Sequence, residues 1–307
     1  MSRQTSLVAS FFMAAVVFSH TLYAQKIDIP NSSFESPVVS FVAIPIDAWQ
    51  KLPKPDSFVE TGGITWDQEV GVFKNTPTNS LDHIDNCDGN QAIWLFAVPQ
   101  VGLFQDYDSK DAQTPTPTHA FDAKFELGKA YQLTVGLIGG GGNMAEGATL
   151  ELSLYYRDAA SNMVTVAATS ITNTADIFTN RTHFINFDVK VPSVKAGDAW
   201  AGRHIGVQLK STVTPELAGG YWDVDNFRLS AITRPALVLS YALQGFDLQI
   251  TWPSETGFRY QVRTSNDLQI WTNLDAPLAG TGGELHKTVS LVNQSQAFFN
   301  VEATPTP

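Results

Sequence analysis

Apolar and polar residues alternate with a period of two along much of the chain. Tyr131, Leu133 and Val135 fall on one side of such a segment, while Gln132 and Thr134 fall on the other. This spacing is typical of β-strands with one buried face, and the spacing of an amphipathic helix is almost absent. The same alternation recurs in residues 150–156, 185–191, 207–209 and 225–229. Many short strands separated by turns predict an all-β protein, a jelly-roll β-sandwich.

The N-terminal part of the chain is less regular and rich in proline. We expect long loops there, with short strands near Phe34, Val70–Phe73 and Ala92–Ala97. Residues 114–118 alternate threonine and proline and predict an extended surface loop. The glycine tract at 139–142 lacks the following Lys and Ser or Thr of a phosphate loop, so we interpret it as a flexible hairpin connection. Long loops on a β-scaffold are where binding surfaces are usually built.

A second set of alternating segments follows a break at Thr233-Arg234-Pro235. Roughly six strands are expected between this break and residue 302, which predicts a small Ig-like or fibronectin-like β-sandwich. The sequence therefore divides into a jelly-roll domain at 25–232, a smaller β-domain at 236–303 and a disordered tail at 304–307.

The first residues predict an exported protein. Arg3 precedes an apolar run from Leu7 to Phe18, and Ala24 offers a small residue at a cleavage point before Gln25. This layout is typical of a secretory signal peptide at residues 1–24. A membrane anchor is the alternative, but the run is shorter than the roughly 20 apolar residues of a spanning helix, and no other segment is long enough. We expect a secreted, extracellular or periplasmic protein without a membrane span, with possible association with the cell surface.

Composition limits the partners. The chain carries 30 acidic and 19 basic residues, a formal net charge of -11, and shows no basic cluster. Nucleic-acid binding is not expected, because phosphate contacts need clustered Lys and Arg. Cys87 is the single cysteine, so no internal disulfide can form. An acidic balance suits divalent cations better.

Acidic residues near both ends of the first domain indicate such a cation. Glu35 closes the segment that starts at Asn31, and Asp225 lies in the last strand, two residues before Phe227 and thus on the face we expect to be the core. First and last strands of a jelly roll commonly lie side by side, which would bring the two carboxylates together. Like charges this close need a cation between them, and Ca²⁺ fits as a structural cofactor. The alternative is that both are exposed at a strand end.

Four motifs carry a resemblance to a known family. "NSSFESP", "DGNQAIWL", "FELGKAYQLTVGLIGGG" and "DVDNFRL" resemble calcium-binding jelly rolls that are similar to carbohydrate-binding modules, and within them the Stig cyclases and their secreted relatives, over about residues 26–232. The resemblance implies that Glu35 and Asp225 are calcium ligands. The cyclases use an aspartate as proton donor in an aromatic pocket, and Asp223 and Asp225 are the acidic positions of the matching motif. The resemblance does not decide between them.

Aromatic residues in the loop-rich regions are candidates for stacking on a sugar ring, with polar neighbours to bind its hydroxyls. We expect Trp94 to be buried, because it lies within an apolar run. The remaining aromatic residues could be core residues instead. The candidate ligand-binding set is Trp49, Trp66, Asp67, Asp88, Gln105 and Tyr107.

In the second domain, "YQVRTSNDLQIW" resembles a C-terminal module of secreted bacterial proteins. Tyr260 and Val262 are expected to face its core, with Trp271 capping it. The resemblance implies an accessory module without a catalytic site.

Three functions remain open at this stage. The first is a secreted, calcium-stabilised module that binds carbohydrate or another small ligand. The second is a Stig-cyclase-like or glycoside-active enzyme that uses Asp223 or Asp225 as general acid. The third is a structural surface protein without a small ligand. The sequence favours the first and contains no nucleophile motif, histidine constellation or phosphate motif. A buried acid among aromatic residues that does not bind calcium would favour the enzyme.

Overall fold

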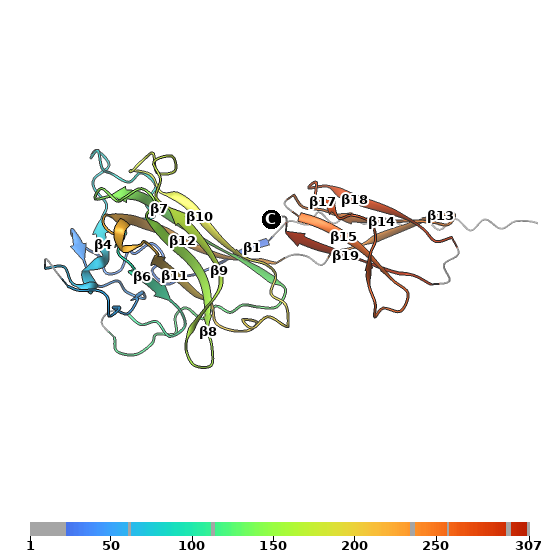
Figure 1. Ribbon diagram of the computed structural model, residues 1–307, viewed down its shortest axis with the longest axis horizontal. Coiled ribbons are helices and arrows are strands. Elements are labelled where there is room, and N and C mark those ends of the chain that lie inside the picture. The colour runs from blue at the N-terminus through green and yellow to red at the C-terminus, as the bar shows by residue number, and fades with distance from the viewer. Residues whose placement is uncertain are drawn as a thin grey trace, which may run out of the picture. The chain divides into compact units, whose positions relative to one another are not determined.

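The computed structural model describes residues 23–60, 63–111, 114–233, 237–256, 258–292 and 296–305. They form two compact units, residues 23–233 and 237–305, each with a hydrophobic core of its own (Figure 1). The predicted junction near Pro235 and most of the predicted signal peptide lie outside the described residues. Tyr23 and Ala24, the described residues of that peptide, pair with Thr233 and Ile232. No described helix is long and apolar enough to cross a membrane.

The larger unit is a jelly-roll β-sandwich of two antiparallel sheets. The first sheet has the order β10 (Ile185–Val191), β7 (Lys129–Gly141), β12 (Tyr221–Thr233), β5 (Gln91–Phe96), β4 (Val70–Lys74), β2 (Val42–Ala43), and β1 (Tyr23–Ile27) pairs with β12. The second has the order β3 (Gln50–Lys51), β6 (Gly102–Gln105), β11 (Gly206–Ser211), β8 (Thr149–Arg157), β9 (Met163–Thr172). The helices of the described residues are two short 3₁₀ turns, η1 (Trp66–Glu69) and η2 (Pro215–Leu217).

The core lies between the two sheets and follows the alternation in the sequence. Leu133 and Val135 of β7 and Leu152 and Leu154 of β8 are fully buried in it. Burying one such side chain contributes roughly 1.5–3 kcal/mol. Phe34 and Glu35 lie in a loop and not in the predicted first strand, and the strand that pairs with β12 on this side is β1, which ends at Ile27. Strands β6 and β9 were not predicted.

A bulge in β12 corrects the predicted direction of Asp225. Val224 and Phe227 both lie in the core although they are three positions apart. Asn226 between them has a left-handed φ of 61°, and the pairing with β7 shifts register between Asp225 and Arg228. The extra residue inverts the alternation, so Asp225 faces away from the core, on the same side of the sheet as Asp223.

The glycine tract is packed rather than flexible, contrary to the sequence interpretation. Gly139 and Gly141 belong to β7. A Cβ at Gly141 would lie 2.4 Å from the ring of Tyr221, and one at Gly139 would lie 2.8 Å from the ring of Phe178. The tract therefore gives two aromatic rings space against the backbone.

The smaller unit consists of two antiparallel sheets around Ile250, Trp252, Tyr260, Val262 and Val289. The predicted burial of Tyr260 and Val262 is confirmed, whereas Trp271 is only partly buried. The predicted disordered tail is wrong at Thr304 and Pro305, which end β19 and pair with β15. One sheet contains β13 (Ser240–Gln244), β14 (Asp247–Pro253) and β18 (Glu284–Ser290), and the other β16 (Thr272–Asn273), β15 (Phe258–Ser265), β17 (Leu278–Ala279) and β19 (Phe298–Pro305).

Candidate functional site

A cavity of about 800 Å³ lies on the outer face of the first sheet of the larger unit. Its walls are residues that alternate with core residues along four strands, so they point away from the core. On β5, for example, Ile93 and Leu95 are buried in the core, whereas Trp94 and Phe96 line the cavity. We call this cavity the sheet pocket. Its aromatic lining is Phe41, Phe73, Trp94, Phe96 and Tyr221, and its aliphatic lining includes Val42, Ile44, Ile64, Ile84 and Ile138.

Trp94 forms a wall of the sheet pocket, although the sequence predicted it to be buried. Its ring is partly exposed, and its indole N–H donates to the carbonyl of Gln68 at 3.1 Å. Gly71 on the neighbouring strand makes room for the ring, because a Cβ there would lie 2.4 Å from it. The burial was wrongly predicted because a run of apolar residues does not show which of them faces the core.

Asp223 is the carboxyl group at the base of the sheet pocket. It pairs with Trp94 of β5 on one side and with Ile138 of β7 on the other. No described residue donates a hydrogen bond to its carboxylate. Desolvation by these apolar neighbours raises the pKa of Asp223 to about 7. The acid is thus available in its protonated form near neutral pH, where an ordinary aspartate is ionised.

Asp225 lies two residues further along β12 and is fully buried beneath the loop of residues 86–91. One oxygen, Oδ2, accepts the backbone N–H of Asp88 at 2.7 Å, and the other, Oδ1, is buried without a partner. Burial raises the pKa of Asp225 to about 7, and the N–H groups of Asn226 and Asp88 and the Cys87 thiol oppose that rise. An unpartnered carboxylate oxygen in such a place is costly unless a cation or proton reaches it.

Glu35, near the N-terminal end of the domain sequence, contacts the same loop as Asp225. Its Oε1 accepts the backbone N–H of Asn90 at 2.9 Å and that of Gln91 at 2.8 Å. Gly89 is required beneath it, since a Cβ there would lie 2.6 Å from the Glu35 carboxylate and its φ is +95°. The structure therefore holds Glu35 and Asp225 against one loop. Asp88 takes part through its backbone N–H, and its side chain is exposed.

The predicted sugar-stacking tryptophans are core residues. Trp49 is 4% exposed and packs against Phe34 and Phe227 with ring centroids 5.4 and 4.8 Å away. Trp66 is 7% exposed, and its indole N–H donates to the carbonyl of Leu52 at 2.7 Å. Neither ring has a free face for a sugar, so their prediction as ligand-binding residues is wrong.

Tyr107 is also unable to stack on a ligand. Its ring lies between His119 and His204, with centroids 4.1 and 4.0 Å away, so both of its faces are covered. Gln105 is fully buried and donates to the carbonyl of Pro30 at 2.9 Å. Asp67 is exposed, and its carbonyl accepts the Lys51 ammonium. These residues do not meet at one surface.

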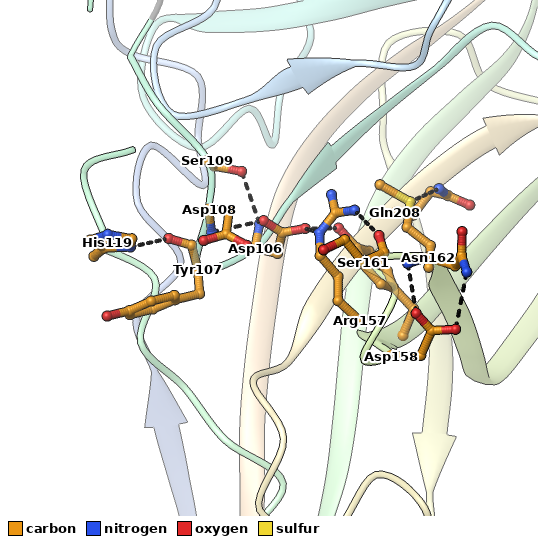
Figure 2. A network of polar contacts seen from close by, with 12 residues as sticks. Asp106, Tyr107, Asp108, Ser109, His119, Arg157, Asp158, Ser161, Asn162 and Gln208 are labelled. Atoms are coloured by element: carbon orange, nitrogen blue, oxygen red, sulfur yellow. Dashed lines mark hydrogen bonds and ion pairs between the residues drawn. The ribbon is translucent and has the colours of Figure 1, made fainter. Parts of the chain in front are cut away.

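The polar network beside Tyr107 holds two elements of the second sheet together (Figure 2). Asp106 is buried and accepts the Tyr155 hydroxyl at 2.7 Å and the Arg157 Nε–H at 2.8 Å. Burial and the nearby Asp106 carboxylate raise the pKa of Tyr155 well above its usual value. The carboxylate is fully engaged within the protein, so the network is structural.

Sequence reasoning missed most of the pocket residues, among them Phe96, Tyr221 and Arg181. For Phe96 and Tyr221 the signal existed, because each alternates with core residues on its strand. Arg181 comes from the loop between β9 and β10, and no local pattern places it in the sheet pocket.

Comparisons with known proteins identify the fold. No family model and no curated protein matches the chain. A cyclase from Fischerella sp. TAU is 21% identical with a TM-score of 0.51, covering 70% of this chain and 100% of that one. A Stig cyclase from the same organism, in complex with (3Z)-3-(1-methyl-2-pyrrolidinylidene)-3H-indole, gives 21% identity over the same shares and a TM-score of 0.50. A xylan-binding domain from Paenibacillus barcinonensis gives a TM-score of 0.32 at 14% identity, covering 62% of this chain and 88% of that one. The jelly-roll fold thus resembles that of the Stig cyclases.

Proposed function

We propose that the larger unit contains an enzyme-like site for a small molecule. In this site the sheet pocket binds a mostly apolar ligand, and Asp223 donates a proton to that ligand. One observation carries this proposal: a carboxyl group without a hydrogen-bond partner among the described residues lies at the base of an aromatic-lined cavity of about 800 Å³. Cavities of 300–1,000 Å³ suit drug-sized ligands. The geometry favours the enzyme alternative over the exposed sugar platform, whose rings are buried or covered.

The chemistry follows from the walls of the pocket. Apolar side chains exclude water from the ligand and keep Asp223 poorly solvated, which favours its neutral form. A neutral carboxyl group can donate its proton to an electron-rich carbon or nitrogen of the ligand. Trp94 and Phe96 line the same cavity as Asp223, and aromatic faces can stabilise the positive charge that develops on the protonated ligand.

An indole serves as the probe, because a Stig cyclase of this fold is known in complex with an indole compound. Protonation at ring carbon C3 of 2-methylindole, followed by loss of the original hydrogen, exchanges that hydrogen for deuterium in D₂O. We expect the protein to accelerate this exchange and Asp223→Asn to lose about tenfold or more of the acceleration while still binding the probe.

Asp82→Asn is the matched control, because Asp82 is an exposed carboxyl group lining the same pocket. Exchange is measured by proton NMR and binding by calorimetry. Equal exchange rates for wild type and Asp223→Asn would contradict the role of Asp223.

Carbohydrate binding is the second candidate, and Trp94 is the observation that favours it. Its ring is partly exposed and lines the sheet pocket together with Gln68 and Asp82, so an aromatic ring and polar residues share the surface of one cavity. Titration with xylohexaose tests this candidate. Binding that is lost in Trp94→Ala and kept in Asp223→Asn would support it over proton transfer.

We further propose that Ca²⁺ binds at Glu35 and Asp225 and stabilises the fold. The fit rests on the buried, unpartnered Oδ1 of Asp225 and on the loop that both carboxylates share. Among the described residues no cluster of three or more His, Cys, Asp and Glu side chains is arranged to hold a metal ion. Backbone carbonyls, which Ca²⁺ accepts readily, would have to complete the site. Secretion and an accessory role for the smaller unit are parts of the same proposal.

A further inference from the structure

Arg181 supplies an unneutralised positive charge to the sheet pocket. It comes from the loop between β9 and β10 and lines the cavity with Tyr221 and Asp223. Its Nη1–H donates to the carbonyl of Gly140. No carboxylate of the described residues lies within ion-pair distance of its guanidinium, Asp223 and Asp82 included. A guanidinium has five N–H donors, and the contacts within the described residues use one of them.

The backbone is shaped to hold this guanidinium. Gly140 has a left-handed φ of +78°, and a Cβ there would lie 3.0 Å from Nη2 of Arg181. The adjoining glycines let the Tyr221 ring lie against the strand, where it lines the same cavity. The Tyr221 hydroxyl has no partner among the described residues. Burial raises its pKa, the nearby Asp223 adds to that rise and Arg181 opposes it, so the hydroxyl stays protonated and remains a donor.

Anchored guanidinium groups with free N–H donors bind carboxylates in a two-pronged geometry. Lys74 lines the same cavity and also lacks an ion-pair partner in the described part of the chain. Asp82 and Asp223 line this cavity as well, and among the described residues neither carboxyl group lies within ion-pair distance of Arg181 or Lys74. We infer that Arg181 and Tyr221 bind an anionic group, so that the natural ligand of the sheet pocket is an aromatic carboxylic acid. This inference rests on the proposed function, because it concerns the same cavity.

Two probes with the same ring test this inference: indole-3-acetate and indole-3-acetamide. We expect the full-length protein to bind the acetate about tenfold or more tightly than the amide, because hydrogen bonds to charged groups are the stronger ones. Arg181→Gln should remove this preference and leave binding of the amide nearly unchanged. Arg181→Lys keeps the charge and should restore part of the preference. Calorimetry measures the affinity of each protein for both probes, and circular dichroism checks the fold of each variant.

Arg228→Gln is the matched control, because Arg228 is an exposed arginine of β12 that contacts Asn186 and does not line the pocket. It changes the net charge equally and should keep the preference for the acetate. Equal affinities of wild type for the two probes would overturn the anion inference alone, as would an equal loss of preference in Arg228→Gln or an Arg181→Lys variant without any preference. Failure of both probes to bind would overturn the proposed small-molecule site together with it.

Discussion

Asp223 and Asp225 lie two positions apart on one face of β12, yet their surroundings differ. Asp223 opens into a cavity and receives no hydrogen bond from a described residue. Asp225 is buried beneath the loop of residues 86–91 and accepts the backbone N–H of Asp88 in that loop. Glu35 accepts two further N–H groups of the same loop. Burial raises the pKa of both groups to about 7.

The difference lies in what covers each carboxyl group. At the closed region, formed by residues 31–35, the 86–91 loop and Asp225, the chain folds back over the strand. At the open region, the sheet pocket, the loops leave space for a ligand. The same residue type on one strand can therefore hold the fold together or meet a ligand, depending on a segment distant in sequence.

The largest expected effect separates the aromatic residues of the two regions. Trp49 packs on Phe34 of the closed region, so Trp49→Ala should lower the free energy of unfolding by roughly 3–5 kcal/mol. Trp94→Ala should cost much less stability, because its ring is partly exposed, but should weaken binding of the indole probe. Urea denaturation and calorimetry measure the two effects. Equal losses of stability would erase the proposed distinction.

Stabilisation of the fold by calcium should depend on Asp225 of the closed region and not on Asp223 of the open region. If the ion binds the folded state alone, a hundredfold excess over its dissociation constant stabilises by about 2.7 kcal/mol. Addition of a chelator should therefore lower the melting temperature of wild type and of Asp223→Asn, but not that of Asp225→Asn. Differential scanning calorimetry reports the shift. A chelator effect that survives in Asp225→Asn would place the ion elsewhere.

A methyl group added to a glycine of the open region should have a smaller effect on stability. A Cβ at Gly141 would meet the Tyr221 ring at 2.4 Å, so Gly141→Ala should displace that ring, cost roughly 1–3 kcal/mol and weaken probe binding. Gly197→Ala is the control, because no atom lies within 4 Å of its Cβ position. Stability and affinity that match those of the control would show that the ring does not depend on the glycine.

The smallest expected effect concerns Lys51, whose side chain is partly buried like that of Asp223 but carries the opposite charge. Burial lowers its pKa to about 8, and the nearby Asp67 opposes this shift. Below pH 8 the folded protein carries the poorly solvated charge at full cost, and the cost disappears as pH rises toward the unfolded pKa near 10.5. Lys51→Met should therefore stabilise by about 1 kcal/mol at pH 7 and by less at pH 10. A gain that grows with pH in thermal melts would reverse the assigned sign.

The sequence by itself determined the β-class and the positions of most long strands. Period-two alternation is local, and burial of one strand face reproduces it directly, as in residues 131–137. The resemblance also marked Asp223 as a possible acid without choosing it over Asp225.

Only the tertiary structure decided which face of each strand lines a cavity. One bulge at Asn226 inverted the side on which Asp225 lies, and a bulge leaves little trace in an alternating pattern. Trp49 is buried against Phe34 and Phe227, and Trp66 against Phe58, so their loop-like sequence surroundings did not indicate exposure. Arg181 enters the sheet pocket from a loop far from Asp223 in sequence, and such a meeting depends on the packing of the whole domain rather than on any local pattern.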